Sequence, residues 1–168
     1  MFYSNARIYG ADFRFHHGAF EVKDGVFGAV LPGNVPDDAV DLQGATVIDV
    51  HTHGNSGADF SDGDYDGLKK MADFYARCGV TSFAPASMTL PYEVPAKAFA
   101  TAVQLKEEKP EGCAALRGIQ MEGPYFSYKK RGAQNPDYLK DPDFEGFKKL
   151  YEGCGGLVRI VDVAPELP

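Results

Sequence analysis

The sequence predicts an α/β fold in which a small antiparallel β-sheet precedes parallel strands joined by helices. Short aromatic and β-branched runs broken by turn pairs occupy residues 6–46, which favours the sheet. From residue 47 onward, apolar strand-like runs alternate with amphipathic stretches, and polar side chains recur where those strands end. We therefore expect a small β domain over residues 1–46 and an α/β domain over residues 47–168.

Composition excludes several classes of partner. The chain of 168 residues has a formal net charge of -7, which gives no electrostatic footprint for nucleic acid. No segment approaches the apolar length that spans a bilayer, and the start of the chain lacks the regions of a signal peptide, so a cytoplasmic location is expected. Cys78, Cys113 and Cys154 are far apart and form no CxxC pair, which favours reduced, mostly buried thiols. Neither nucleic acid nor a membrane is an expected partner.

The opening segment contains a predicted β-hairpin. Residues 20–23 alternate apolar and charged side chains, Asp24-Gly25 suits a type I′ turn, and residues 26–30 return as the partner strand. His16 and His17 lie near a predicted turn, and we interpret them as solvated turn residues.

The stretch VIDVHTHG, residues 47–54, organises the second domain. Its β-branched residues are typical of a strand covered on both faces, and Gly54 ends it. Because strand side chains alternate between faces, His51 and His53 point the same way with their rings one pleat apart. One strand can thus deliver two imidazoles to one metal, although HxH by itself also fits a pair of ordinary strand-end histidines.

Helices and strands then alternate. A polar loop over residues 54–63 precedes the first helix, in which Leu68, Met71, Tyr75 and Cys78 mark one face. Helical crossovers between strands imply a parallel sheet. The expected elements are a helix over about 64–78, a strand over 80–86, a helix over about 92–108, a strand over 116–121, a helix from Asp141 or Asp143 to the glycines at 153–156, and a strand over 157–164.

Polar residues gather at the ends of the predicted strands: His51, His53, Ser87, Met88, Thr89, Glu122, Asp162 and Glu166. In a (β/α)8 barrel the C-terminal strand ends form the active-site face. Two imidazoles and a carboxylate suit a divalent metal while leaving positions open for hydrolytic chemistry. We therefore predict that His51, His53 and Glu122 bind zinc, with iron, manganese and cobalt as alternatives. The competing interpretation of Glu122 is a helix-cap or surface carboxylate.

Two motifs resemble a known family. VIDVHTHG resembles the first-strand signature of the amidohydrolase superfamily, and residues 120–126, QMEGPYF, with residues 130–134, KRGAQ, resemble the N-acetylglucosamine-6-phosphate deacetylases. Residues 164–166, APE, agree with this, and the resemblance spans nearly the whole chain. It implies the first half of a metal-dependent (β/α)8 hydrolase barrel, preceded by part of a split β-sandwich.

The resemblance also implies roles for single residues. Glu122 would bind the catalytic metal, and His51 and His53 would bind a second metal where one is present. Ala133 and Gln134 would contact the sugar, although relatives often carry His at the position of Gln134, and the amide lacks the titratable group. The implied reaction is amide hydrolysis of N-acetylglucosamine 6-phosphate to glucosamine 6-phosphate and acetate. The implied partners are a small-molecule amino-sugar phosphate and, for a full-length protein, a second copy in a homodimer.

The sequence departs from the family pattern in two places. A Pro-Gly-apolar insert that usually precedes the first barrel strand is missing at residues 45–47, which removes roughly 10 Å of reach. The family's further metal histidines and catalytic aspartate would lie beyond Pro168, so no catalytic residue is assigned here. We expect an N-terminal portion that is inactive alone, in which Val50, Ile119 and Ile160 are partly exposed.

Three alternatives stay open. Lys129, Lys130 and Arg131 are interpreted as a solvated charge run rather than as a phosphate site. Another amidohydrolase, such as a dihydroorotase or adenine deaminase, would share HxH but not the Glu-Gly-Pro and Gly-Ala-Gln context. A non-catalytic fragment that binds metal or sugar phosphate is the alternative from another class, and a turnover assay separates it from an enzyme.

Overall fold

The computed structural model describes residues 1–9, 12, 14–43 and 47–167. The chain divides into two compact units, Met1–Val47 with Arg77–Gly79, and Ile48–Ala76 with Val80–Pro168. The domain limits of 1–46 and 47–168 stay a prediction. The shortened entry to the first barrel strand falls on residues 45–47, of which 45 and 46 lie outside the described residues.

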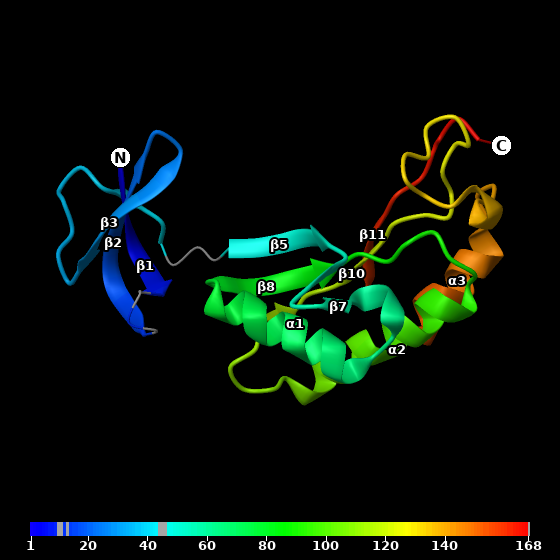
Figure 1. Cartoon of the computed structure of the whole chain (residues 1–168), viewed down its shortest axis with the longest axis horizontal. Helices are drawn as coiled ribbons and strands as arrows, with labels where there is room; N and C mark the ends of the chain where they lie inside the picture. The colour runs from blue at the N-terminus through cyan, green and yellow to red at the C-terminus, as the bar shows by residue number, and fades with distance from the viewer. Residues whose placement is uncertain (10–11, 13, 44–46, 168) are drawn as a thin grey trace. The chain divides into compact units, whose positions relative to one another are not determined.

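A four-stranded sheet with the order β3-β2-β1-β4 forms the first unit (Figure 1). Strand β2 pairs antiparallel with β1 on one side and with β3 on the other, whereas β4 pairs parallel with β1. The predicted small antiparallel sheet is therefore found. It contains one additional parallel strand, and its first strand begins at Phe2 rather than near residue 6. The strands are β1 Phe2–Tyr9, β2 Phe15–Lys23, β3 Val26–Pro32 and β4 Val40–Asp41.

The predicted hairpin turn joins β2 to β3. Lys23 pairs with Val26, and the two residues between them have positive φ, 53° at Asp24 and 77° at Gly25. A type I′ turn requires positive φ at both central positions, which Asp and Gly tolerate better than most residues. The prediction from the Asp-Gly pair is confirmed.

His16 and His17 do not lie at a turn. They pair with Ile8 and Arg7 in the ladder between β1 and β2, and the His16 Nε2 atom lies 2.9 Å from Asp12 Oδ1. The predicted place near a turn was wrong because β2 begins at Phe15, five residues before the alternating stretch that indicated a strand, whereas the expected solvent exposure is found at His17. The cross-strand hydrogen bonds extend the strand through residues whose own pattern does not alternate.

The second unit contains parallel strands joined by helices. In one sheet β8, Val80–Pro85, lies between β5, Val47–Thr52, and β9, Ala115–Leu116. In another, β10, Ile119–Met121, pairs parallel with β11, Val158–Val161. A parallel bridge between Ala86 and Gln120 joins the two groups of strands.

The strand predicted over residues 116–121 is divided into β9 and β10. Arg117 N donates to Phe83 O over 3.0 Å, whereas Ile119 N donates to Leu157 O over 2.9 Å. After Arg117-Gly118 the backbone therefore gains the segment entering β11 as a hydrogen-bonding neighbour, while Gln120 still pairs with the residues that follow β8. The single-strand prediction was wrong here because side-chain alternation does not record which neighbour the backbone pairs with.

The three predicted helices are present: α1 Tyr65–Arg77, α2 Glu93–Glu108 and α3 Phe144–Gly153. Asp143 is the N-cap of α3, and its Oδ1 accepts from Gly146 N over 2.9 Å, which satisfies an otherwise free helix donor. The polar loop before α1 is more ordered than expected. It contains the strands β6 Gly54–Asn55 and β7 Ala58–Asp59 and the 3-10 turn η1 Phe60–Asp62, and a second 3-10 turn, η2 Pro136–Tyr138, lies later in the chain.

The hydrophobic core of this unit lies between the strands and the helices, and Figure 1 shows α1 and α2 along one side of β5 and β8. Its largest fully buried side chains include Phe60, Leu68, Met71, Phe83 and Phe99. Full burial of such a side chain stabilises the fold by about 1.5–3 kcal/mol. Together they hold the helices against the strands, so the strand ends are fixed in relation to one another.

Two expectations about exposure were wrong. Ile48 and Val50, which point to the same face of β5, are 50% and 53% exposed, so this strand is not covered on both faces. The exposure expected for Val50 is thus found. Ile119, expected to be exposed, is fully buried because it packs into the core formed with the helices. Ile160 is half-buried, as expected.

The cysteines are free thiols, but only Cys154 is buried. Cys78 is exposed, so its predicted place on the buried face of α1 was wrong. The helix ends at Arg77, and Gly79 follows with a φ of 82° that breaks the helical path. Among the described residues, no helix is both long enough and apolar enough to cross a membrane.

Candidate metal centre

His51, His53 and Glu122 meet at one end of the parallel strands. Their ligand atoms all lie within 4.8 Å of one another, and no other group of three such residues is found in the described part of the chain. The His53 Nε2 atom lies 2.9 Å from Glu122 Oε2, and the His51 Nε2 atom lies 3.7 Å from the same oxygen. The two rings stand edge to face, with centroids 5.1 Å apart. The convergence predicted from the HxH spacing and the strand ends is confirmed, whereas metal binding stays a prediction.

Backbone pairing explains this convergence. Ala86, just after β8, donates from its N–H to Thr52 O over 2.7 Å and forms the bridge with Gln120. Ser87 N also donates to Gln120 O, over 3.0 Å. The end of β8 therefore lies between the end of β5, which carries the histidines, and the end of β10, which is followed by Glu122. In parallel sheets, residues that follow neighbouring strands emerge at the same edge.

Hydrogen bonds at Nδ1 determine which ring nitrogen of each histidine carries the proton. The His53 Nδ1 atom lies 3.1 Å from the backbone oxygen of Ala86. A carbonyl oxygen only accepts, so Nδ1 is the donor, and in the neutral ring the lone pair is then on Nε2. The His51 Nδ1 atom lies 2.9 Å from Gln120 Oε1, which places the proton in the same way. In their neutral forms, both rings thus direct an Nε2 lone pair toward Glu122.

This donor set fits a metal ion. Glu122 Oε2 is buried and has no hydrogen-bond partner among the described residues, although two imidazole nitrogens face it. Tetrahedral ligands about 2.0 Å from zinc lie about 3.3 Å apart, and the observed separations of 2.9 and 3.7 Å fall on either side of that value. A proton on one ring would satisfy one contact only, whereas a cation between the three atoms satisfies all of them.

The second carboxylate oxygen of Glu122 is held by Gln134. The Gln134 amide donates from Nε2 to Glu122 Oε1 over 2.9 Å, and its Oε1 accepts from Thr89 N over 3.0 Å. Gln134 is buried, and both ends of its amide have partners within the protein. Sequence reasoning missed this contact and assigned Gln134 to the sugar. Ala133, the other residue assigned to the sugar, is exposed, and sugar contact by either residue stays a prediction.

The remaining strand-end residues take different positions. Ser87 and Thr89 are buried, and their hydroxyl oxygens have no hydrogen-bond partner among the described residues. Asp162 reaches the cluster indirectly, because its Oδ2 accepts from Gln120 Nε2 over 2.7 Å. Glu166 is exposed and is not part of the cluster.

Gly123 makes the turn after Glu122 possible. Its φ is 75°, and a Cβ at this position would clash with the side chain of Thr89. Both the backbone conformation and the close approach require glycine. The turn therefore places Gly123 directly against the side chain of Thr89.

The basic loop before Ala133, residues 129–131, lies at the surface in this structure. Lys129 and Lys130 are exposed. The Arg131 guanidinium lies 4.2 Å from the centroid of the Tyr128 ring and donates to the Tyr128 backbone oxygen over 2.6 Å. These contacts agree with the interpretation of residues 129–131 as surface charge.

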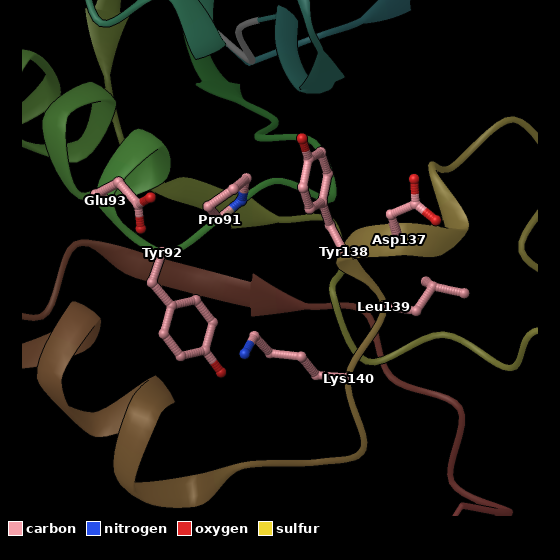
Figure 2. A pocket seen from close by; sticks show the side chains of 7 residues that line it. All are labelled: Pro91, Tyr92, Glu93, Asp137, Tyr138, Leu139 and Lys140. Carbon is pink, nitrogen blue, oxygen red and sulfur yellow. The ribbon is translucent and has the colours of Figure 1, made fainter.

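A pocket of about 280 Å³ opens beside the start of α2 (Figure 2). One of its residues, Tyr92, shares a hydrogen bond of 2.9 Å with the Tyr125 hydroxyl, and burial raises the pKa of both phenols. The pocket shares no lining residue with the cluster, so it does not contribute to the candidate centre. It is lined by Pro91, Tyr92, Glu93, Asp137, Tyr138, Leu139 and Lys140.

Comparison with curated proteins places the chain beside amino-sugar-phosphate deacetylases. No family model matches. The chain is 38% identical over 133 residues to the N-acetylglucosamine-6-phosphate deacetylase of Bacillus subtilis (strain 168), covering 78% of this chain and 33% of the relative. It is 31% identical over 147 residues to the N-acetylgalactosamine-6-phosphate deacetylase of Escherichia coli O157:H7, covering 86% and 39%. The chain thus spans only about a third of the length of the curated relatives that it matches.

A solved structure agrees with these relatives. It is a mutant N-acetyl-D-glucosamine-6-phosphate deacetylase from Mycobacterium smegmatis in complex with N-acetyl-D-glucosamine-6-phosphate. It matches with a TM-score of 0.65 and 25% identity, covering 92% of this chain and 41% of that chain. The predicted fold class, a partial (β/α)8 barrel preceded by a small β-sheet, is confirmed by this likeness and by the parallel strands with helical crossovers.

Proposed function

We propose that this chain carries the metal-binding end of an amide-hydrolysing active site. The proposal starts from the similarity of the chain to an N-terminal portion of the N-acetylglucosamine-6-phosphate deacetylases. The observation that carries the proposal is the meeting of His51 Nε2 and His53 Nε2 at one oxygen of Glu122, 3.7 and 2.9 Å away. The proposed reaction releases acetate and an amino-sugar 6-phosphate.

The three ligands have distinct roles in this proposal. Glu122 supplies the single negative charge, and the two neutral imidazoles supply nitrogen donors. When bound, a divalent ion held by this set supplies a Lewis acid for the amide carbonyl and activates water for attack. Zinc is the proposed ion because it accepts mixed nitrogen and oxygen ligands, and iron, manganese and cobalt are the alternatives.

Contacts around the ligands hold them ready for the ion. Gln134 fixes one carboxylate oxygen of Glu122, and the Ala86 carbonyl and Gln120 orient the two rings. The side chains of His51, His53 and Glu122 are 49%, 32% and 20% exposed, so an ion and a substrate can reach the open side. Catalytic groups pre-oriented in this way need no rearrangement during the reaction.

The substrate contacts are also part of the proposal. Gln134 touches Glu122, and the exposed Ala133 precedes it, so a sugar whose amide lies at Glu122 would lie near Ala133. N-acetylglucosamine 6-phosphate is the first candidate, because the relative named for it is the more similar. N-acetylgalactosamine 6-phosphate is the second candidate, because the Escherichia coli relative is named for it.

The proposal includes a cytoplasmic location and a homodimer of the full-length protein, with no nucleic-acid or membrane partner. The location follows from the class of substrate, since phosphorylated amino sugars are small polar metabolites. The homodimer is supported by the family resemblance alone.

Zinc titration tests the metal centre. The 168-residue chain, its Glu122→Gln variant and its Lys130→Gln variant would each compete with a chromophoric zinc chelator. We expect one zinc per chain, a large loss of affinity in Glu122→Gln, and no change in Lys130→Gln, because Lys130 is an exposed residue of the basic loop. Absence of zinc binding by the unaltered chain, or equal losses in the two variants, would overturn the proposed centre.

An acetate-release assay tests the reaction. Both sugar phosphates would be offered to the complete product of the gene, with and without added zinc. Preferential release from N-acetylglucosamine 6-phosphate supports the first candidate, and preferential release from its 4-epimer supports the second. No release from either would refute the deacetylase proposal.

A further inference from the structure

We propose that Asp162 is a positioning residue for the metal centre, which acts through Gln120 to select the metal-binding tautomer of His51. This inference rests on the proposed function of the His51, His53 and Glu122 cluster. Asp162 touches none of these three side chains in a hydrogen bond or ion pair recorded among the described residues. Its effect on the centre would therefore be transmitted by the intervening amide.

The geometry forms a chain of two hydrogen bonds across three strands. His51, on β5, donates from Nδ1 to Gln120 Oε1 over 2.9 Å. Gln120, on β10, donates from Nε2 to Asp162 Oδ2 over 2.7 Å. Asp162 follows β11, and its backbone N–H donates to Met121 O over 3.1 Å. This backbone bond fixes the register that places the carboxylate beside the Gln120 amide.

A side-chain amide has one donating end and one accepting end, so its orientation determines what each neighbour meets. An ionised carboxylate only accepts, and Asp162 therefore requires the NH2 group of Gln120. The amide oxygen must then face His51, and that oxygen requires a proton on Nδ1. Gln120 is only 8% exposed, so water has little access to replace either contact.

The reversed amide would disable the histidine as a ligand. If the NH2 group faced His51, the ring would accept at Nδ1 and carry its proton on Nε2. That proton would point at Glu122 and occupy the lone pair needed for the metal. The negative charge of Asp162 prevents this reversal, because it would meet the amide oxygen.

His53 has no such dependence. Its Nδ1 lies 3.1 Å from the backbone carbonyl of Ala86, which cannot exchange a donor for an acceptor. A change at Asp162 should thus alter the tautomer of His51 and leave that of His53 unchanged. This difference gives an internal reference within one protein sample.

The main variant is Asp162→Asn, which keeps the shape of the side chain but can present either an acceptor or a donor to Gln120. The matched control is Glu108→Gln, because Gln104 Nε2 donates to Glu108 Oε1 over 2.8 Å on the exposed side of α2, away from the cluster. The rescue variant is Asp162→Glu, which restores a carboxylate. A second disrupting variant, Gln120→Met, removes the amide with little change in volume.

Two measurements are made on each variant at one fixed pH. The 15N chemical shifts of the imidazole nitrogens in the metal-free protein report the tautomer, and chelator competition reports the zinc affinity. In Asp162→Asn we expect His51 to lose its preference for a proton on Nδ1, His53 to keep its preference, and the zinc affinity to fall roughly 10-fold or more. Glu108→Gln should match the unaltered protein, and Asp162→Glu should recover part of the affinity.

The outcomes separate this inference from the proposed function. If the unaltered protein binds zinc and Asp162→Asn retains both the His51 tautomer and the affinity, the inference is overturned. If the unaltered protein binds no zinc, the metal proposal fails, and the 15N shifts still decide whether Asp162 controls the tautomer. Should Asp162→Asn not fold, Gln120→Met replaces it, and an unchanged His51 tautomer in that variant overturns the inference equally.

Discussion

Gln134 donates a hydrogen bond of 2.9 Å from its Nε2 atom to Glu122 Oε1, which leaves Oε2 as the oxygen that faces both histidines. The two residues are separated in the sequence by the turn at Gly123 and the basic loop. The contact fixes the plane of the carboxylate before any ligand arrives.

Removal of the Gln134 amide should weaken metal binding. In Gln134→Ala, the buried Thr89 N–H and the partly buried Glu122 Oε1 both lose their partner, at a cost of about 1–3 kcal/mol. We expect a lower zinc affinity in chelator competition, while Gln104→Ala, on the exposed side of α2, leaves the affinity unchanged. An unaltered affinity in Gln134→Ala would show that the carboxylate needs no such support.

Truncation of Phe99 should destabilise the second unit strongly. Its ring is 1% exposed and stacks on Phe60, with centroids 6.1 Å apart. Phe99→Ala leaves a cavity between α2 and η1, and such changes cost about 3–5 kcal/mol. Urea unfolding monitored by circular dichroism measures this loss. Phe144→Ala is the matched control because that side chain is 70% exposed, and a comparable loss there would contradict the core assignment.

The Tyr65 hydroxyl donates to the Glu108 carboxylate, linking the start of α1 to the end of α2. This bond is the main cause that lowers the pKa of Glu108, and it raises the pKa of Tyr65 to about 12. A lowered carboxyl pKa stabilises the fold above the usual value of 4.5, and that stabilisation is lost as the pH falls through the lowered pKa. A raised phenol pKa stabilises the fold below the usual value of 10.0, and that part is lost as the pH rises toward 12.

The variant Tyr65→Phe tests this linkage. We expect the pKa of Glu108 to move upward, although the Gln104 contact keeps it below the usual value. A carboxyl 13C titration by NMR measures the shift. Tyr138→Phe, whose hydroxyl belongs to the η2 turn, should leave Glu108 unchanged, and an equal titration in Tyr65→Phe and the unaltered protein would disprove the link.

The 168-residue polypeptide alone should bind metal without deacetylase turnover. Three ligands are brought together in its described part, and the sequence motifs assign no catalytic aspartate to it. The half-exposed side chains of Ile48 and Val50 on the edge strand β5 should also favour self-association. All three points are checked on one preparation. Mass spectrometry detects bound metal, acetate release measures turnover, and analytical ultracentrifugation measures self-association. A monomer that releases acetate at an enzyme-like rate would refute this expectation.

The cluster of His51, His53 and Glu122 could be predicted from the sequence, because it depends on side-chain alternation within one strand and on the order of neighbouring strands. Alternation along the strand places His51 and His53 on one face, and the rule that parallel strands end at one edge brings Glu122 to them. The turn at Asp24-Gly25 was predictable for the same reason, since its residue types suit positive φ. The short β6–β7 hairpin was missed although it had a signal. Ser56 and Gly57 both have positive φ, 55° and 77°, as the pair between two strands requires.

The contacts behind the ligands could not be predicted. Gln120, Gln134 and Asp162 act through the direction in which an amide points, and no periodicity of the sequence records that direction. The division between β9 and β10 was hidden for a related reason, because the backbone gains a second neighbour after Arg117-Gly118 without a change in side-chain alternation. The burial of Ile119 follows from where the helices lie against the strands.

The turn at Gly123 restricts which residues a randomised library of this protein would retain at position 123. Two separate obstacles exclude other residues there, the clash of a Cβ with Thr89 and the φ of 75°. A smaller residue at position 89 would remove only the first obstacle, so paired substitutions at 89 and 123 should not rescue one another. Functional clones should keep glycine at 123 whatever stands at 89, and the two positions should show no covariation despite their contact.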